Sequence, residues 1–148
     1  MTKLILAGPD DLDHVLRLLG DFHAETGITQ DEATRRAALA PLLDGSPHGC
    51  VYLAGPARAP IGCVVVVFGW STAFGGMEGK IDVLYIRPGV RGRGIGSEIL
   101  ATLPKALGAA GLAALHLDVA RDNDAMHRLY AKQHFRARDN ILRMTRKL

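Results

Sequence analysis

Aromatic residues, cysteines and long apolar runs are all scarce in this chain of 148 residues. Aromatic side chains make up 5% of it and none lies among the basic residues at 91, 93 and 143–147, which argues against a surface that stacks nucleic-acid bases. No apolar run approaches the roughly 20 residues that cross a bilayer, and the run at residues 4–6 is too short for a secretion signal. We therefore expect a cytoplasmic protein with no nucleic-acid and no membrane partner.

Net charge and cysteine content limit the kinds of ligand and site that this chain can form. The net charge of +3 is modest and suits an anionic ligand. The two cysteines, Cys50 and Cys63, lie in separate apolar runs without metal-type spacing around them, so we expect two small buried side chains and neither a disulfide nor a metal site. A G-x-S-x-G nucleophile elbow is absent from the sequence, which removes one route to covalent catalysis.

The apolar periodicity predicts one α/β domain over residues 1–148. Asp10 or Asp11 caps a first helix, and the capping-box pattern at 29–32 starts a second helix that runs to about Asp44. Pro104 is expected to kink or break the helix that contains it. The other expected elements are strands at 3–6, 50–54, 61–70, 80–86 and 114–119, a glycine-rich loop at 71–79, helices at 94–110 and 124–133, and a terminal pair of strands at 135–148. This order, β-α-α-β-β-β-α-β-α-β-β, predicts a mixed, mostly antiparallel sheet of about seven strands with four helices on its faces.

A glycine cluster follows the strand at 80–86. Gly92, Gly94 and Gly96 alternate with Arg91, Arg93 and Ile95 just before a helix, so the backbone can turn sharply and offer the first N–H groups of that helix to an anion. The pattern suits a pyrophosphate, although a flexible surface turn would look the same. The Walker motif is absent, and the spacing departs from the Rossmann fingerprint. Asp118 lies where a ribose-binding acid of that fingerprint would lie, so dinucleotide binding stays open as a remote alternative. The chain has too little room for the second half of a nucleotide-binding sheet.

Two motifs together resemble a known family. Arg91-x-x-Gly94-x-Gly96, after an apolar strand end and a proline, is similar to the acetyl-CoA signature of GNAT acyltransferases. The segment from Asn123 to Tyr130, followed by Phe135, resembles that family's fourth helix. His134 replaces the usual glycine, and histidine tolerates a left-handed backbone better than most residues do. The resemblance implies an N-acetyltransferase that uses acetyl-CoA and no metal, acts on a primary amine of a small molecule or peptide, and is a homodimer in many relatives.

The resemblance also implies where the cofactor binds. The expected residues lie at the end of the 80–86 strand, in the glycine loop with the first helical turn, and on the 124–133 helix. They are Leu84, Tyr85, Ile86, Arg91, Gly92, Arg93, Gly94, Ile95, Gly96, Ser97, Asn123 and Tyr130. In the family a backbone N–H of the splayed strand binds the oxyanion, which by position is Leu84 or Ile86 here. Tyr130 takes the family role of the tyrosine that protonates, or hydrogen-bonds to, the leaving thiolate.

The acid that accepts the amine's proton stays open between two residues. Asp82 is the first candidate and Glu78 the second, while a solvated strand residue is the simpler interpretation of Asp82. Strand alternation places Asp82, Leu84 and Ile86 on one face. His23 and Glu25 are weaker candidates for acceptor contact, with solvated surface favoured for both. The alternative function is a non-catalytic sensor that binds acyl-CoA.

Overall fold

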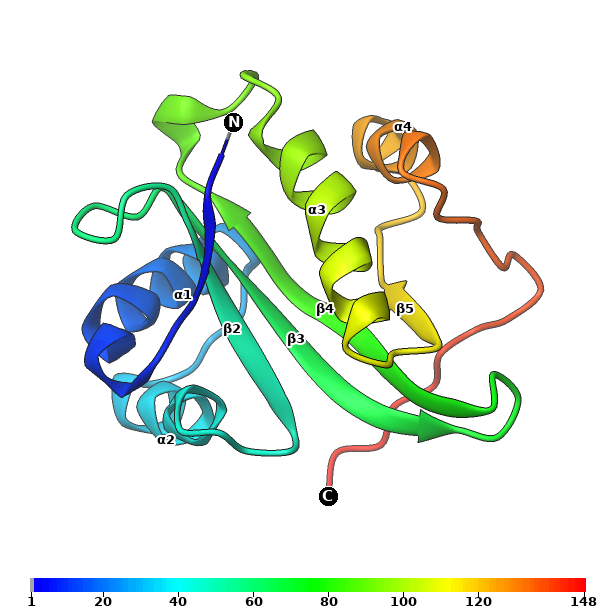
Figure 1. Ribbon diagram of the computed structural model, residues 1–148, viewed down its shortest axis with the longest axis horizontal. Helices are drawn as coiled ribbons and strands as arrows, with labels where there is room; N and C mark the ends of the chain where they lie inside the picture. The colour runs from blue at the N-terminus through cyan, green and yellow to red at the C-terminus, as the bar shows by residue number, and fades with distance from the viewer. Residues whose placement is uncertain (1) are drawn as a thin grey trace. The chain divides into compact units, whose positions relative to one another are not determined.

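A computed structural model describes residues 2–148, which divide into two compact units, one ending at Asp118 and one beginning at Val119. That the chain acts as a single domain stays a prediction. The first unit contains, in chain order, β1 (Leu4–Leu6), α1 (Leu12–Thr26), α2 (Glu32–Leu43), β2 (Gly49–Ala54), β3 (Gly62–Ser71), β4 (Gly76–Ile86), α3 (Ile95–Ala109) and β5 (Ala114–Leu117) (Figure 1). The second unit contains α4 (Asp124–Lys132) and an irregular C-terminal segment. None of the helices in residues 2–148 is long and apolar enough to span a bilayer.

The sheet is mixed and mostly antiparallel, as expected. Its order is β1-β2-β3-β4-β5, and β5 alone pairs in parallel, with β4. The expected count of about seven strands is not confirmed, because the described residues form five and no strand follows β5. Leu142 and Met144 in the C-terminal segment are 79% and 88% exposed. The pair of strands predicted at 135–148 is therefore wrong, since a strand needs a partner to satisfy its backbone and the segment pairs with none of the described strands.

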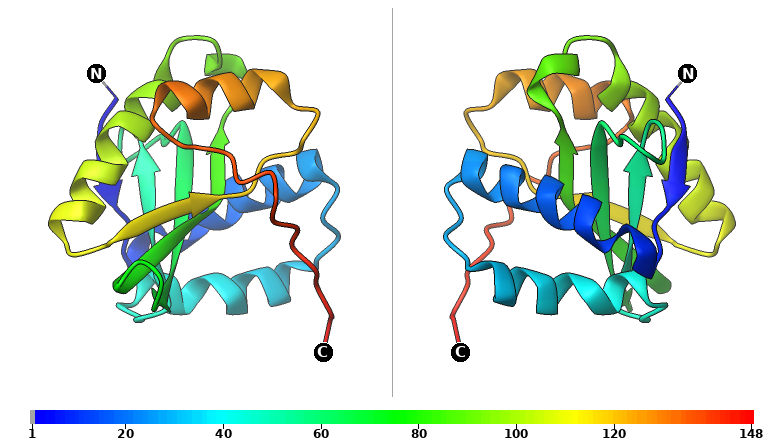
Figure 2. Two further views of the ribbon diagram at one scale, coloured as in Figure 1. Left: turned by 90° about the vertical axis from the view of Figure 1, so that its right-hand side faces the viewer. Right: turned by 90° about the vertical axis from the view of Figure 1, so that its left-hand side faces the viewer.

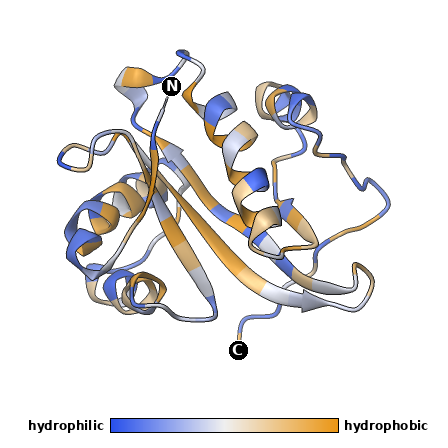
Figure 3. Cartoon of the chain, in the orientation of Figure 1, coloured by the Kyte–Doolittle hydropathy of each residue, from blue (hydrophilic) through white to orange (hydrophobic). Residues whose placement is uncertain are grey.

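Helices cover both faces of the sheet in the first unit. One apolar cluster joins α1 and α2 to one face, where Val65 and Val83 are buried, and α3 lies on the opposite face (Figure 2). The central strands are largely hydrophobic, and the helices that pack on them carry both hydrophobic and hydrophilic residues (Figure 3). This is the pattern that apolar spacing at i, i+3 and i+4 produces when a helix packs on a sheet.

The structure tests the predicted start of α2 and the predicted effect of Pro104 on α3. The second helix forms where predicted, but the capping box expected at 29–32 does not: α2 is capped by Asp31, whose carboxylate accepts a hydrogen bond of 2.7 Å from the Thr34 backbone N–H. Of the kink or break predicted at Pro104, the break is wrong, because α3 is continuous from Ile95 to Ala109. Proline removes a single helical hydrogen bond, and Leu103 and Leu107 are only 0% and 3% exposed, so packing on the sheet outweighs that loss.

The β3–β4 hairpin is longer than the sequence suggested. The sequence predicts a glycine-rich loop at 71–79, but Ser71 and Gly76 pair with each other across the hairpin. Only the residues between them form the turn. Gly79 lies within β4, and a side chain does not fit there, because a Cβ at this position would come within 2.7 Å of a Leu112 side-chain carbon. A glycine that marks close packing was thus misinterpreted as a loop residue.

Candidate functional site

The strands β4 and β5 separate halfway along β4. They pair in register only from Glu78 opposite Ala114 to Ile81 opposite Leu117. From Asp82 to Ile86, β4 pairs with β3 alone among the described strands. The C-terminal half of β4 therefore has one open edge.

A β-bulge marks the point of separation. Val65 of β3 lies opposite Val83, but the next residue of β3, Val66, lies opposite Ile81, so Asp82 is the extra residue. The bulge changes the alternation of β4. Asp82 lies on the α1–α2 face, where its carboxylate is 3.9 Å from the Lys80 ammonium, and not on the face of Leu84 and Ile86 that strict alternation predicts.

The open edge presents backbone N–H groups. The Arg87 N–H donates to the Ile61 carbonyl at 2.8 Å, which identifies this cross-strand pair as hydrogen-bonded. Because hydrogen-bonded and non-bonded pairs alternate in an antiparallel ladder, Tyr85 points its N–H toward β3, whereas Leu84 and Ile86 point theirs away from it. The Tyr85 side chain is 5% exposed and packs edge-on against Phe22 in the core.

The glycine loop directly follows this edge. Gly92 and Gly94 both have φ of +79°, and a Cβ built on either would meet nothing within 4 Å. Gly94 caps α3, so the N–H groups of Ile95, Gly96 and Ser97 have no acceptor within the helix. These groups and the helix dipole together favour an anion beside the loop.

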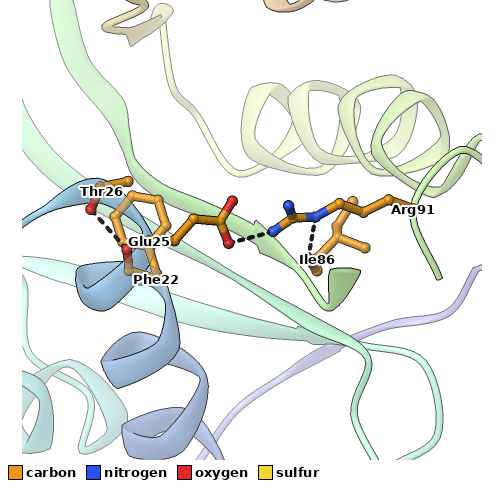
Figure 4. Close-up of polar contacts among 5 residues, drawn as sticks. All are labelled: Phe22, Glu25, Thr26, Ile86 and Arg91. Carbon is orange, nitrogen blue, oxygen red and sulfur yellow. Dashed lines mark hydrogen bonds and ion pairs between the residues drawn. The ribbon is translucent and has the colours of Figure 1, made fainter. Parts of the chain in front are cut away.

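The two loop arginines differ in their surroundings. One Arg91 amino group lies 2.7 Å from the Glu25 carboxylate on α1, and its Nε donates to the Ile86 carbonyl at 2.8 Å (Figure 4). The hydrogen bond from Arg91 lowers the pKa of Glu25, so this carboxylate is ionised at neutral pH. Arg93 forms no ion pair with any residue from 2 to 148, and it borders a shallow depression of about 490 Å³ that Ile95 and Glu98 also line. Arg93 is thus the loop cation available to a ligand.

Ionisable groups gather on the α1–α2 face of β4 and β5. His116 Nε2 lies 2.8 Å from a Glu78 carboxylate oxygen, and Lys80 Nζ lies 3.1 Å from the Asp118 carboxylate. His23 of α1 lies near enough to Asp82 for that carboxylate to oppose the lowering of the His23 pKa by burial and by Arg35. The lowered pKa leaves His23 neutral at pH 7. In the residues that the structure describes, no three His, Cys, Asp or Glu side chains form a metal-binding group.

The second unit carries the remaining predicted residues. The Asn123 side chain caps α4 by accepting a bond of 3.3 Å from the Met126 N–H. Tyr130 is 9% exposed, its ring packs edge-on against Phe135 at 5.9 Å, and burial raises its phenol pKa, so it is protonated at neutral pH. His134 has φ of +69°, as its position in the motif predicted. The N–H of Phe135 bonds to the Tyr130 carbonyl, which closes the helix in a Schellman motif.

Sequence reasoning missed several partners in this region. Nothing in the sequence pairs Glu25 with Arg91, because 66 residues separate them. His116 and Lys80 carried no motif, although strand alternation places Glu78 and Lys80 on one face, and that signal could have grouped them.

Comparison with known proteins identifies the family. The Acetyltransferase (GNAT) family profile matches residues 13–135, which include both the glycine loop and α4. The chain belongs to the GNAT family. Curated relatives include an acetyltransferase of Sodalis glossinidius, 33% identical over 81 residues that cover 53% of this chain and 57% of the relative. Another, from Pectobacterium atrosepticum, is 37% identical over 68 residues that cover 46% and 48%. The chain thus spans about half the length of the curated relatives it matches.

Solved structures show the same GNAT fold over nearly the whole chain. A candidate acetyltransferase from Arthrobacter sp. FB24 is 30% identical, with a TM-score of 0.83 that covers 99% of this chain and 96% of that one. An aminoglycoside acetyltransferase from a soil metagenome, solved with sisomicin, is 14% identical with a TM-score of 0.79 and covers 99% and 96%. The latter likeness concerns the fold alone. As a GNAT chain, this protein has the glycine-loop motif after the open edge of β4 in its first unit and the α4 motif in its second unit.

Proposed function

We propose that this protein is an N-acetyltransferase that moves an acetyl group from acetyl-CoA to a primary amine by direct attack. The observation that carries the proposal is the continuity of β4 with the glycine loop. The same strand that has an open edge from Asp82 to Ile86 leads directly into a turn with exposed N–H groups. An extended ligand that ends in a diphosphate fits such an arrangement.

The residues present fit coenzyme A. The space around Gly92 and Gly94 is open where a side chain would otherwise stand, and the N–H groups of Gly94 to Ser97 lie at the positive end of α3. Arg93 adds a cation without an internal partner in residues 2–148. When bound, acetyl-CoA supplies the thioester carbonyl that the amine attacks.

Acceptor deprotonation is the first demand on the protein. An ammonium with a pKa near 10.4 costs about 4 kcal/mol to deprotonate at pH 7.4. Asp82 lies at the bulge where β4 and β5 separate, and its side chain is 50% exposed. Glu78 lies four residues earlier, about 13 Å along the strand, and already contacts His116. These positions favour Asp82 as the proton acceptor, directly or through water, with Glu78 as the second candidate.

Charge on the carbonyl oxygen is the second demand. The Leu84 or Ile86 N–H, turned toward the open edge, serves as the donor, and one such donor contributes about 3 kcal/mol in other enzymes. The third demand is the departing thiolate. Tyr130 donates a hydrogen bond to it, because transfer of a proton from a phenol near pKa 10 to a thiolate near 8.5 costs about 2 kcal/mol. Burial raises the Tyr130 pKa and increases that cost, so hydrogen bonding is the favoured role.

A screen of thioester consumption tests the proposal. Neither composition nor fold selects the acceptor, so the panel includes aminoglycosides, polyamines, amino acids and peptides with a free N-terminal alanine. A neighbour of 19% identity is a ribosomal-protein-alanine N-acetyltransferase, and this broadens the panel to peptides. Mass spectrometry then identifies an acylated product. Tight acetyl-CoA binding without thioester loss for any amine would favour the sensor function, and no binding would refute both.

A further inference from the structure

The Arg91 side chain is held on two elements outside its own loop. Its Nε donates to the Ile86 carbonyl at the end of β4, and an amino group contacts Glu25 near the end of α1 (Figure 4). The guanidinium also lies 5.5 Å from the centre of the Tyr85 ring. All three contacts turn the guanidinium toward α1 and β4. The arginine of the glycine-loop motif therefore uses its side chain for the protein itself.

The contact between Arg91 and Glu25 affects the loop conformation more than the overall stability of the protein. The Arg91 and Glu25 side chains are 42% and 45% exposed, and ion pairs with that much exposure contribute little to folding stability. Arg91, however, directly precedes Gly92 and Gly94, which both have positive φ and much conformational freedom. An anchor at this position restrains a loop that would otherwise sample several conformations.

We propose that Glu25 is a positioning residue that acts through Arg91 to hold the loop at 87–94 in the conformation that presents the α3 N–H groups to the cofactor. This inference rests on the function proposed above. The Glu25 carboxylate forms its hydrogen bond and ion pair with Arg91, so the effect of Glu25 on the loop conformation passes through the guanidinium.

A purely electrostatic role for Glu25 predicts the opposite result. Glu25 is a negative charge near a site for a polyanion, so if it anchored nothing its removal would tighten acetyl-CoA binding. As an anchor, its removal weakens binding, because only part of the loop population remains competent. The sign of the change therefore separates the two roles.

The experiment compares Glu25→Gln, Arg91→Met, the double variant and Glu25→Asp with the unmodified protein. Asp21→Asn is the matched control, since it removes the same charge from an exposed position one turn earlier on α1. The first measurement is amide hydrogen exchange without cofactor. Exchange at residues 89–95 becomes faster in Glu25→Gln and Arg91→Met, and stays unchanged in Asp21→Asn.

The second measurement is calorimetric titration with acetyl-CoA. Each single variant raises Kd about tenfold, as expected if roughly one loop in ten remains competent. The double variant is no weaker than the weaker single variant, because both substitutions remove the same contact. Glu25→Asp recovers part of the affinity.

Two outcomes overturn the assignment. If the unmodified protein binds acetyl-CoA and Glu25→Gln binds equally or more tightly, Glu25 positions nothing and only this inference fails. If the unmodified protein binds no acetyl-CoA, the proposed function fails and the assignment fails with it.

Discussion

The imidazole of His116 lies 2.8 Å from the carboxylate of Glu78, on neighbouring strands that still pair at this level. Glu78, the second candidate base, thus already has a partner within the sheet, four residues before the bulge. Asp82 lies at the bulge itself, and its carboxylate is 3.9 Å from the Lys80 ammonium, a longer distance than that between Glu78 and His116. The two acids therefore differ in position and in partner, which makes them separable by substitution.

Asp82→Asn is expected to lower kcat/KM for the amine by about a hundredfold, the lower range for loss of a general base. Glu78→Gln, an equally isosteric change on the same strand, is expected to lower it only several-fold. Initial rates of thioester consumption between pH 6 and 9 measure both. The reverse order would transfer the role to Glu78.

Tyr130→Phe is expected to lower kcat by ten- to a hundredfold while the acetyl-CoA Kd changes by less than about twofold. The substitution removes only the hydroxyl, so the ring keeps its packing against Phe135. Tyr52→Phe, which removes the same hydroxyl from a tyrosine on β2, serves as the control. An unchanged kcat in Tyr130→Phe would remove this residue from the mechanism.

Gly94→Asp is expected to abolish acetyl-CoA binding in a protein that still folds. The position has φ of +79°, where a side chain costs about 1–2 kcal/mol, and the new carboxylate would face the phosphates. Gly89→Asp adds the same charge to the same loop at a position with open space and no positive φ. Calorimetry on both variants separates the two effects, and equal losses would mean that charge alone is responsible.

Cys63 is expected to resist alkylation in the native protein. Burial raises its pKa to about 12, and since the thiolate is the reactive form, only about one molecule in ten thousand is reactive at pH 8. Burial also raises the pKa of Cys50, so this thiol reacts more slowly than in the unfolded chain. Iodoacetamide labelling with and without urea, read by mass spectrometry, measures both rates. Rapid native labelling of Cys63 would contradict its burial.

Leu103→Ala is expected to destabilise the protein by about 2–5 kcal/mol, because this α3 side chain is fully buried and its removal leaves a cavity. Leu142→Ala is the matched control at 79% exposure, and its effect should stay within about 0.5 kcal/mol. Urea unfolding curves give both values. A small effect at Leu103 would show that α3 contributes little to the core.

Local features of this protein could be predicted from adjacent residues. Gly92 and Gly94 adopt the left-handed backbone that a turn before a helix requires, and His134 adopts it at the end of α4. The periodicity of α1 and the polar start of α2, which Asp31 caps, likewise concern residues within one turn of each other. These features depend on backbone sterics and on hydrogen bonds between near neighbours, so a short stretch of sequence contains the information.

Only the tertiary structure decided which face Asp82 occupies and what Arg91 contacts. The bulge arises from the register between β3 and β4, and a one-residue shift in that pairing changes the face of a side chain. The Glu25–Arg91 and Glu78–His116 contacts join residues 66 and 38 positions apart, and Pro104 stays helical because its neighbours pack on the sheet. Such outcomes depend on which distant segments meet when the core forms, and that information is spread over the whole chain.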